Sequence, residues 1–336
     1  MTMAQSRNDH GAVWLNRNSD FRTGLETDES EFSALRFGET NIDDALRDEL
    51  RAGVIDDAAR PDAGWVNRDA LLEQMSSKLI EEIDRRSLIL GEAYPFVRKK
   101  NRLIYHRSKS GIYEFCLAIT MAPSLSKGEF AQLPIAFEFL ARDTLRLFAG
   151  PRAEAFRTGA PRHSRDKMPP RGRQLFDRLN QLTGEWRWRP NTQLPSPPPY
   201  SHAKDFGLDV VSWIPIPGVQ LGHLFLLGQC ACGTSGWQVK WGDLNLLRLH
   251  DWMELVTMVT PVRCFLVPFH LGNPEALREV CRDAGLVFDR TRITLIAHGI
   301  AQREFAPLKP YWHWIDLVSG EPGRRAKRRS SASRNK

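Results

Sequence analysis

The sequence lacks long hydrophobic runs and has few cysteines. No stretch approaches the roughly 20 apolar residues that a membrane-spanning helix needs, and residues 1–10 are polar and lack the apolar core of an export signal. Five cysteines are scattered over 336 residues. That distribution is typical of a reducing compartment and does not suggest a disulfide framework. We therefore expect a cytoplasmic protein that makes no membrane contact.

Two widespread catalytic motifs and any internal repeat are also missing from the sequence. Without a Gly-x-x-x-x-Gly-Lys-Ser/Thr loop, a nucleotide-driven motor is not expected, and without a Gly-x-Ser-x-Gly elbow, neither is a serine hydrolase. The hydrophobic fraction of 42% and the charged fraction of 26% are ordinary for a globular protein. A chain of this length can form two domains.

The positive charge is unevenly distributed. The whole chain carries +7, but residues 1–60 hold thirteen Asp or Glu and seven Arg, a net charge of −6, so the remainder carries +13. An excess of positive charge fits a polyanionic partner such as nucleic acid. It fits a basic protein with a solvated surface equally well.

The N-terminal half is predicted to be mainly helical. Residues 1–60 are acidic and weakly periodic, and we expect a partly ordered arm with a short helix near 41–52. A helical domain is expected over 61–194. Its predicted elements are helices at 68–90, 131–148 and 171–183 and a hairpin over 102–120, with strands at 103–105 and 112–117.

The C-terminal half is predicted to be an α/β domain over 195–320, and the helix at 171–183 is a candidate member of it. The proline-rich segment 195–199 reads as a stiff linker and marks the expected boundary. The predicted elements are strands at 207–214, 223–231, 263–269 and 286–297 and helices at 243–259 and 274–284. A hairpin followed by alternating helices and strands predicts an α+β mixed sheet covered by helices. We expect the basic tail at 321–336 to be disordered.

An arginine-rich region lies just before the proline-rich segment, with Trp186 and Trp188 interleaved near its end. Guanidinium groups bind phosphate oxygens in a fork geometry and indole rings stack on bases, so this region is a candidate nucleic-acid contact. The alternative is that the arginines solvate a loop while both tryptophans pack in the core. The candidate nucleic-acid-binding residues are Arg162, Arg165, Lys167, Arg171, Arg173, Arg187 and Arg189.

The most informative stretch is the predicted hairpin at 204–232. Asp209 begins one strand, and Gln229 ends the apolar run of the next. A carboxylate and an amide oxygen on adjacent strands can hold Mg²⁺ or Mn²⁺, with the carbonyl of Cys230 as a third ligand. Such an ion polarises a phosphoryl oxygen and lowers the pKa of a bound water. Taken singly, Asp209 is equally explained as a turn residue, and Gln229 as a buried amide.

These residues resemble the PD-(D/E)XK restriction-endonuclease-like superfamily, particularly its Mrr-type members. There, an Asp follows a glycine on one strand, and Glu or Gln followed by X-Lys lies on the next. Gly207 and Asp209 match the first part, and Gln229 the second, but Ala231 replaces the lysine. The resemblance covers roughly 170–300. It implies a restriction-endonuclease-like core, DNA as substrate with RNA left open, and a role with protein partners in bacterial defence against phage or foreign DNA.

The alanine at position 231 removes an ammonium group that is thought to orient or activate the attacking water in this superfamily. Three interpretations follow: another lysine supplies the cation, the metal suffices alone, or the domain binds nucleic acid or scaffolds a complex without cutting. A carboxylate on the preceding helix, such as Glu185, is a further candidate ligand. The catalytic candidates are Asp209, Gln229, Lys204 and Lys240, and the metal candidates are Asp209, Gln229 and Cys230.

Zinc is a weaker alternative. The residue types of a zinc site are present in Cys230, Cys232 and Cys264 with His250 or His270. Their spacing matches no zinc finger or ribbon. We expect these cysteines to be small buried residues beside the sheet.

Overall fold

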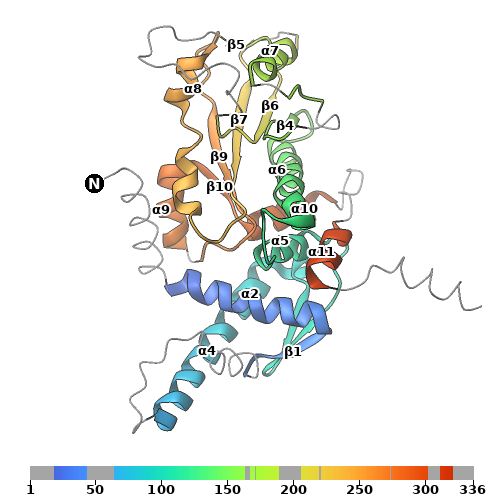
Figure 1. Cartoon of the computed structure of the whole chain (residues 1–336), viewed down its shortest axis with the longest axis vertical. Helices are drawn as coiled ribbons and strands as arrows, with labels where there is room; N and C mark the ends of the chain where they lie inside the picture. The colour runs from blue at the N-terminus through green and yellow to red at the C-terminus, as the bar shows by residue number, and fades with distance from the viewer. Residues whose placement is uncertain are drawn as a thin grey trace, which may run out of the picture.

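A five-stranded mixed sheet forms the centre of the upper part of the molecule in Figure 1. The computed structural model describes residues 19–43, 64–162, 167–170, 172–188, 206–218, 221–272, 274–301 and 311–320. In the order β10-β9-β7-β6-β4, the strands are β10 (Leu286–Phe288), β9 (Val262–Leu266), β7 (Leu224–Cys230), β6 (Val210–Ile214) and β4 (Glu154–Arg157). Neighbours are parallel from β10 to β7 and antiparallel from β7 to β4.

Both faces of this sheet are covered by helices, which explains why its strands are apolar on both sides. Alternate residues point to opposite faces. Val210 and Leu226 therefore join one cluster with α6 (Leu133–Ala149) and α10 (Arg290–Ala301). Val211 and Leu227 join a second cluster with α7 (Gly172–Thr183). A third cluster lies under α9 (Pro274–Ala284) and the 3₁₀ turn η5 (Trp237–Gly242).

The remaining elements form the lower part of Figure 1 and the far end of the sheet. A second sheet, β1-β3-β2, consists of β1 (Glu39–Asn41), β3 (Arg102–Tyr105) and β2 (Phe96–Lys99). It lies with α2 (Ser19–Phe37), α4 (Gly64–Leu90), α5 (Ile112–Thr120), α11 (Trp312–Ser319) and the short turns η1 (Gly91–Ala93) and η2 (Gly128–Gln132). At the other end, β5 (Trp186–Trp188) pairs with β8 (Met253–Leu255), which follows α8 (Leu246–Trp252).

A buried charge cluster joins these parts. Arg290 donates to both carboxylate oxygens of Asp28, at 2.9 and 2.7 Å. Arg86 donates to Asp28 at 2.7 Å and to Glu31 at 2.9 Å. All four side chains are at most 1% exposed. Because Asp28 and Glu31 lie on α2, Arg86 on α4 and Arg290 on α10, the cluster fixes α2 against helices from both ends of the chain.

The mixed α/β class and the helices at 68–90, 131–148, 171–183 and 274–284 are confirmed. The sheet, however, draws on both sides of the expected boundary at 195–199, because β4 pairs with β6. That boundary lies outside the described residues, as does the basic tail at 321–336. Of the helix expected near 41–52, the structure describes residues 41–43 only: Asn41 ends β1, and Ile42 and Asp43 are helical.

Four expectations about local structure were wrong. Residues 19–37 form helix α2, which was not expected. Its buried face includes the polar residues Thr27, Asp28 and Glu31, so the sequence shows no continuous apolar stripe there. Residues 112–120 form helix α5 instead of the expected strand. The prediction failed because every residue from Ile112 to Ile119 is buried, so no apolar period in the sequence marks a helix. The helix expected to reach 259 ends at Trp252, since β8 pairs with β5. The strand expected to reach 297 ends at Phe288.

The end of β10 has a local cause. Asp289 follows the strand, and its Oδ1 accepts the backbone N–H of Arg292 at 3.2 Å. A carboxylate that accepts an N–H in the first turn is a helix N-cap, so α10 begins directly after the strand. Among all the described helices, α10 included, none is long and apolar enough to cross a membrane.

His270 extends the buried cluster toward the sheet. Its Nε2 lies 3.0 Å from the Tyr113 hydroxyl oxygen, and its Nδ1 lies 2.9 Å from the Thr291 hydroxyl oxygen. The Tyr113 hydroxyl donates its own proton to Glu31 at 2.7 Å. The hydrogen-bond network therefore assigns the Nε2–H of His270 as the donor to Tyr113 and its Nδ1 as an acceptor from Thr291. The ring is neutral in this arrangement.

We predict a pH-dependent contribution of His270 to stability. Burial, together with the charges of Arg86 and Arg290, holds the pKa of His270 well below its usual value of 6.5. The unfolded chain therefore binds a proton below pH 6.5 that the folded chain does not, and stability is lost as the pH falls. Urea unfolding between about pH 6.5 and 5 should show wild type losing up to about 1.4 kcal/mol per pH unit more than His270→Gln. Identical slopes for the two proteins would contradict this assignment.

Candidate functional site

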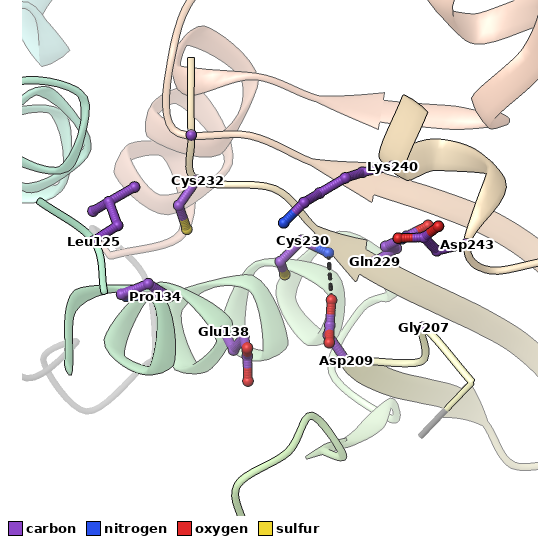
Figure 2. A pocket seen from close by; sticks show the side chains of 11 residues that line it. Leu125, Pro134, Glu138, Gly207, Asp209, Gln229, Cys230, Cys232, Lys240 and Asp243 are labelled. Carbon is purple, nitrogen blue, oxygen red and sulfur yellow. Dashed lines mark hydrogen bonds between the residues drawn. The ribbon is translucent and has the colours of Figure 1, made fainter. Parts of the chain in front are cut away.

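A pocket of about 550 Å³ opens where α6, the start of β6, the end of β7 and η5 meet (Figure 2). It combines acidic, basic, amide and thiol side chains with a short apolar wall. The lining residues are Leu125, Pro134, Glu138, Gly207, Asp209, Gln229, Cys230, Cys232, Gly233, Lys240 and Asp243. Of the residues proposed from sequence, Asp209, Gln229, Cys230 and Lys240 come together here, whereas Lys204 lies outside the described residues.

The chain enters β6 through a turn that requires glycine. Gly207 has a φ of +76°, and a Cβ there would lie 2.8 Å from the carbonyl carbon of Asp243. A larger residue would push apart the backbone segments that bound the pocket. Two residues later, Asp209 joins the sheet by donating its N–H to the Gly228 carbonyl at 2.9 Å. The glycine thus sets the place from which the Asp209 side chain enters the pocket.

The Asp209 carboxylate is oriented by the neighbouring strand. Its Oδ2 accepts the backbone N–H of Cys230 at 2.8 Å (Figure 2). The Asp209 carbonyl also accepts the N–H groups of Thr158 and Gly159, at 2.8 and 3.1 Å, so the loop after β4 is tied to it. A carboxylate that accepts a backbone N–H, on a residue whose own backbone is fixed from the other side, is a preorganised group and not a mobile surface charge.

Glu138 is the functional candidate that the sequence did not reveal. It projects from α6 toward Asp209, as Figure 2 shows. A Cβ built on Gly159 would lie 2.9 Å from Glu138 Cδ and 3.1 Å from Asp209 Oδ1, so these two atoms are within about 6 Å of each other. Arg157, fully buried at the end of β4, pairs with Glu138 at 2.7 Å. A side chain at position 159 would displace the Glu138 carboxylate from its present position beside Asp209.

Glu185, the carboxylate expected from sequence to add a ligand, does not belong to the pocket. Glu185 is completely buried, but it accepts the N–H of His223 at 2.9 Å and the hydroxyl of Thr257 at 3.3 Å. These bonds connect β5 to the hairpin and to the segment after β8, and Glu185 does not line the pocket. The signal for Glu138 was an acidic residue next to the apolar stripe of the helix predicted at 131–148.

Lys240 supplies an ammonium group to the pocket. It lies on η5, and Figure 2 shows its side chain reaching over Cys230. Ala231, at the position where the superfamily has lysine, is 1% exposed and belongs to the apolar cluster under η5. The cation at the mouth of the pocket therefore comes from a residue nine positions further along the chain.

Gln229 has a different environment from Asp209. Its amide oxygen Oε1 accepts the backbone N–H of Leu244 at 3.1 Å, and the side chain is 4% exposed. In Figure 2 it lies beside Asp243 and away from Asp209. In this arrangement Gln229 fixes the segment that follows η5.

The surroundings of the two thiols of the pocket disfavour their thiolate form. Burial raises the pKa of both Cys230 and Cys232 well above the usual value, and the nearby carboxylates of Asp209 and Glu138 raise it further. Neutral thiols are poor nucleophiles and poor metal ligands. Within the described parts of the chain, no group of three or more His, Cys, Asp or Glu side chains is placed to hold a metal ion.

One of the candidate nucleic-acid-binding arginines, Arg162, is buried in the structure. Arg162 is 9% exposed and donates to the carbonyls of Thr158, Pro169 and Pro170 at 2.5 to 2.8 Å. This corrects its assignment as a nucleic-acid contact, because its donors already hold the loop after β4 together. Lys167 and Arg187 are exposed. Arg165, Arg171 and Arg189 lie outside the described residues, and the side chain of Arg173 is not described.

Both tryptophans of that region pack in the core. Trp186 is fully buried, with its ring 5.2 Å from Phe225, and Trp188 stacks on Phe176 at 5.3 Å. The part of the alternative that concerns the two rings is therefore confirmed: Trp186 lies in the core, and Trp188, which is partly buried, packs against it.

Comparison with protein-family models, with curated proteins and with solved structures finds no match. The function must therefore be inferred from the geometry of the pocket itself.

Proposed function

We propose that the chain is a metal-dependent endonuclease that hydrolyses phosphodiester bonds in DNA. The observation that carries the proposal is the convergence of Glu138, Asp209 and Lys240 on one pocket. Two carboxylates and an ammonium group are the charges that a phosphodiesterase needs to hold a divalent cation and to bind the phosphate undergoing attack.

The carboxylates fit a magnesium ion. Mg²⁺ is commonly held by one or two carboxylates and keeps several waters. Glu138 and Asp209 provide that number within about 6 Å, and Gly159 leaves the space between them open. Arg157 and the Cys230 N–H fix the two groups in advance. When bound, Mg²⁺ or Mn²⁺ polarises a phosphoryl oxygen and lowers the pKa of a water.

The protein groups have separate roles in this proposal. Asp209 and Glu138 hold the cation. The Lys240 ammonium binds a non-bridging phosphate oxygen and stabilises the charge that develops on it. Gln229, through Leu244, holds the segment after η5 in place. Lys240 thus supplies to the pocket the ammonium group that the lysine at position 231 supplies in the superfamily.

The order of elements supports a restriction-endonuclease-like core. Strands β6 and β7 are followed along the chain by η5, helix α8, strand β8 and strand β9, and β9 is parallel to β7. Apart from β8, which pairs with β5 outside this sheet, the order is the strand-strand-helix-strand order expected of that superfamily. A cytoplasmic role in defence against phage or foreign DNA, together with protein partners, follows from the resemblance alone and is part of the proposal. The charge of +13 outside residues 1–60 supports a polyanionic substrate.

A second candidate is a nuclease-fold subunit that binds nucleic acid or scaffolds a complex without cutting it. The observation in its favour is that Gln229 accepts a backbone N–H and that position 231 belongs to the apolar core. Gln229, at the end of β7, and Ala231, just after it, both have structural roles in this arrangement, which is expected of a degenerate site.

A cleavage assay separates the two candidates. Supercoiled plasmid, single-stranded DNA and RNA are each incubated with the full chain and Mg²⁺ or Mn²⁺, with EDTA as the control. The endonuclease proposal predicts nicking or linearisation of DNA that EDTA abolishes. Binding in a gel-shift assay without cleavage of any substrate would contradict it and favour the non-catalytic subunit.

A further inference from the structure

We propose that helix α2 positions Lys240 through a direct aromatic contact between Phe21 and Trp237. Phe21 is therefore a positioning residue for the pocket, although it is 219 residues away from Lys240 in sequence. The inference rests on the proposed function of the pocket, and it makes the N-terminal helix part of the site.

The segment that carries Lys240 depends on its surroundings for its conformation. The turn η5 is a 3₁₀ helix of six residues, preceded by Gly236 at a φ of +69° without a side-chain cap. Short 3₁₀ helices have poor hydrogen-bond geometry, and side chains three residues apart lie on the same side. Trp237 and Lys240 have this spacing. The position of the Trp237 ring consequently determines the place from which the Lys240 side chain leaves the backbone.

Trp237 is held by an aromatic cluster that α2 completes. The indole is fully buried, and its ring centroid lies 5.4 Å from Phe269 and 5.8 Å from Phe21. Phe21 also meets Phe269 edge-on at 5.7 Å, so its ring contacts both partners. Aromatic pairs at these distances restrict ring orientation as well as contributing buried area. Without Phe21, the indole loses one of the rings that hold it.

Helix α2 is itself immobilised, which allows it to act as a support. Two turns beyond Phe21, Asp28 is bound by both Arg86 and Arg290, and Glu31 is bound by Arg86. These ion pairs are almost completely buried and connect α2 to α4 and α10. Phe21 is thus held in place by its helix. It contacts Trp237, and Trp237 in turn positions the turn that carries Lys240.

Amide hydrogen exchange of residues 237–243 tests the inference without any substrate. Phe21→Ala should accelerate exchange in this segment about tenfold or more, because η5 loses its support. Phe21→Leu retains apolar bulk and should give an intermediate acceleration. The matched control is Leu35→Ala, a buried residue of the same helix that belongs to a different cluster. Unchanged exchange in Phe21→Ala, or equal acceleration in Leu35→Ala, would overturn the inference.

A kinetic double-mutant cycle then tests the link to Lys240. Phe21→Ala alone should lower kcat about tenfold with KM nearly unchanged, and Phe21→Leu should recover part of the loss. In a Lys240→Ala background, Phe21→Ala should change kcat less than about twofold, because the group it positions is gone. Additive losses in the double variant would overturn the positioning role. If wild type cuts no substrate, the proposed function fails, and the exchange experiment alone decides whether α2 orders η5.

Discussion

Arg290→Met is expected to lower the free energy of unfolding by about 3–5 kcal/mol. The substitution leaves Asp28 with a single remaining arginine partner, in a site where its carboxylate is 1% exposed. The cost of an uncompensated buried charge exceeds the desolvation relieved by removing the guanidinium. Arg290 also donates to the Pro268 carbonyl at 2.8 Å and to the Thr120 hydroxyl at 2.9 Å, and both acceptors lose this donor.

Urea denaturation monitored by circular dichroism measures this effect, and Arg292→Met is its matched control. Arg292 lies two residues away on the same helix and pairs with Asp289 at 2.9 Å, but its side chain is 39% exposed. An ion pair of this exposure contributes about 0–1 kcal/mol. Asp28→Asn, which keeps the shape and removes the charge, should fall between the two. If Arg290→Met and Arg292→Met lower the free energy of unfolding by the same amount, the buried cluster does not hold α2 against α4 and α10 as the structure indicates.

Asp209→Asn is expected to reduce DNA cleavage by at least about 1,000-fold, which corresponds to about 4 kcal/mol of transition-state stabilisation. The asparagine oxygen can still accept the Cys230 N–H, so the local hydrogen bond is retained. What is lost is the negative charge that holds the cation. The free energy of unfolding should stay within about 1 kcal/mol of wild type, because the shape is unchanged.

Asp243→Asn is the control for this prediction. Asp243 also lines the pocket, but it lies beside Gln229 and on the far side from Asp209 in Figure 2. Its substitution should reduce the initial rate of plasmid nicking less than about tenfold. Equal losses in the two variants would indicate a general electrostatic effect of the pocket and not a cation held by Asp209.

The sequence predicted those helices whose buried stripe is apolar. Helices α6 and α7 have such stripes and were expected at nearly their observed bounds. Helix α2 was missed because it buries Thr27, Asp28 and Glu31. Burying such residues is favourable only beside Arg86 and Arg290, which are 58 and 262 residues from Asp28 in sequence. No local pattern can signal a partner at that distance.

The site was predictable to the extent that its residues lie close together in sequence. Asp209 and Cys230 belong to one hairpin, and the structure brings both of them to the pocket with Lys240. Glu138 was missed because α6 precedes the expected domain boundary, and only the pairing of β4 with β6 brings that helix to the site. For Gln229, the sequence could not show that Leu244 would use its amide oxygen.

Manganese binding tests the central claim most directly, because it requires neither a target sequence nor a partner protein. Mn²⁺ is titrated into wild type, Asp209→Asn, Glu138→Gln and the control Asp243→Asn, and free ion is followed by electron paramagnetic resonance. The account predicts one specific Mn²⁺ per wild-type chain, affinity at least about tenfold lower in Asp209→Asn and in Glu138→Gln, and little change in Asp243→Asn. Binding that is unaffected by Asp209→Asn and Glu138→Gln would contradict it.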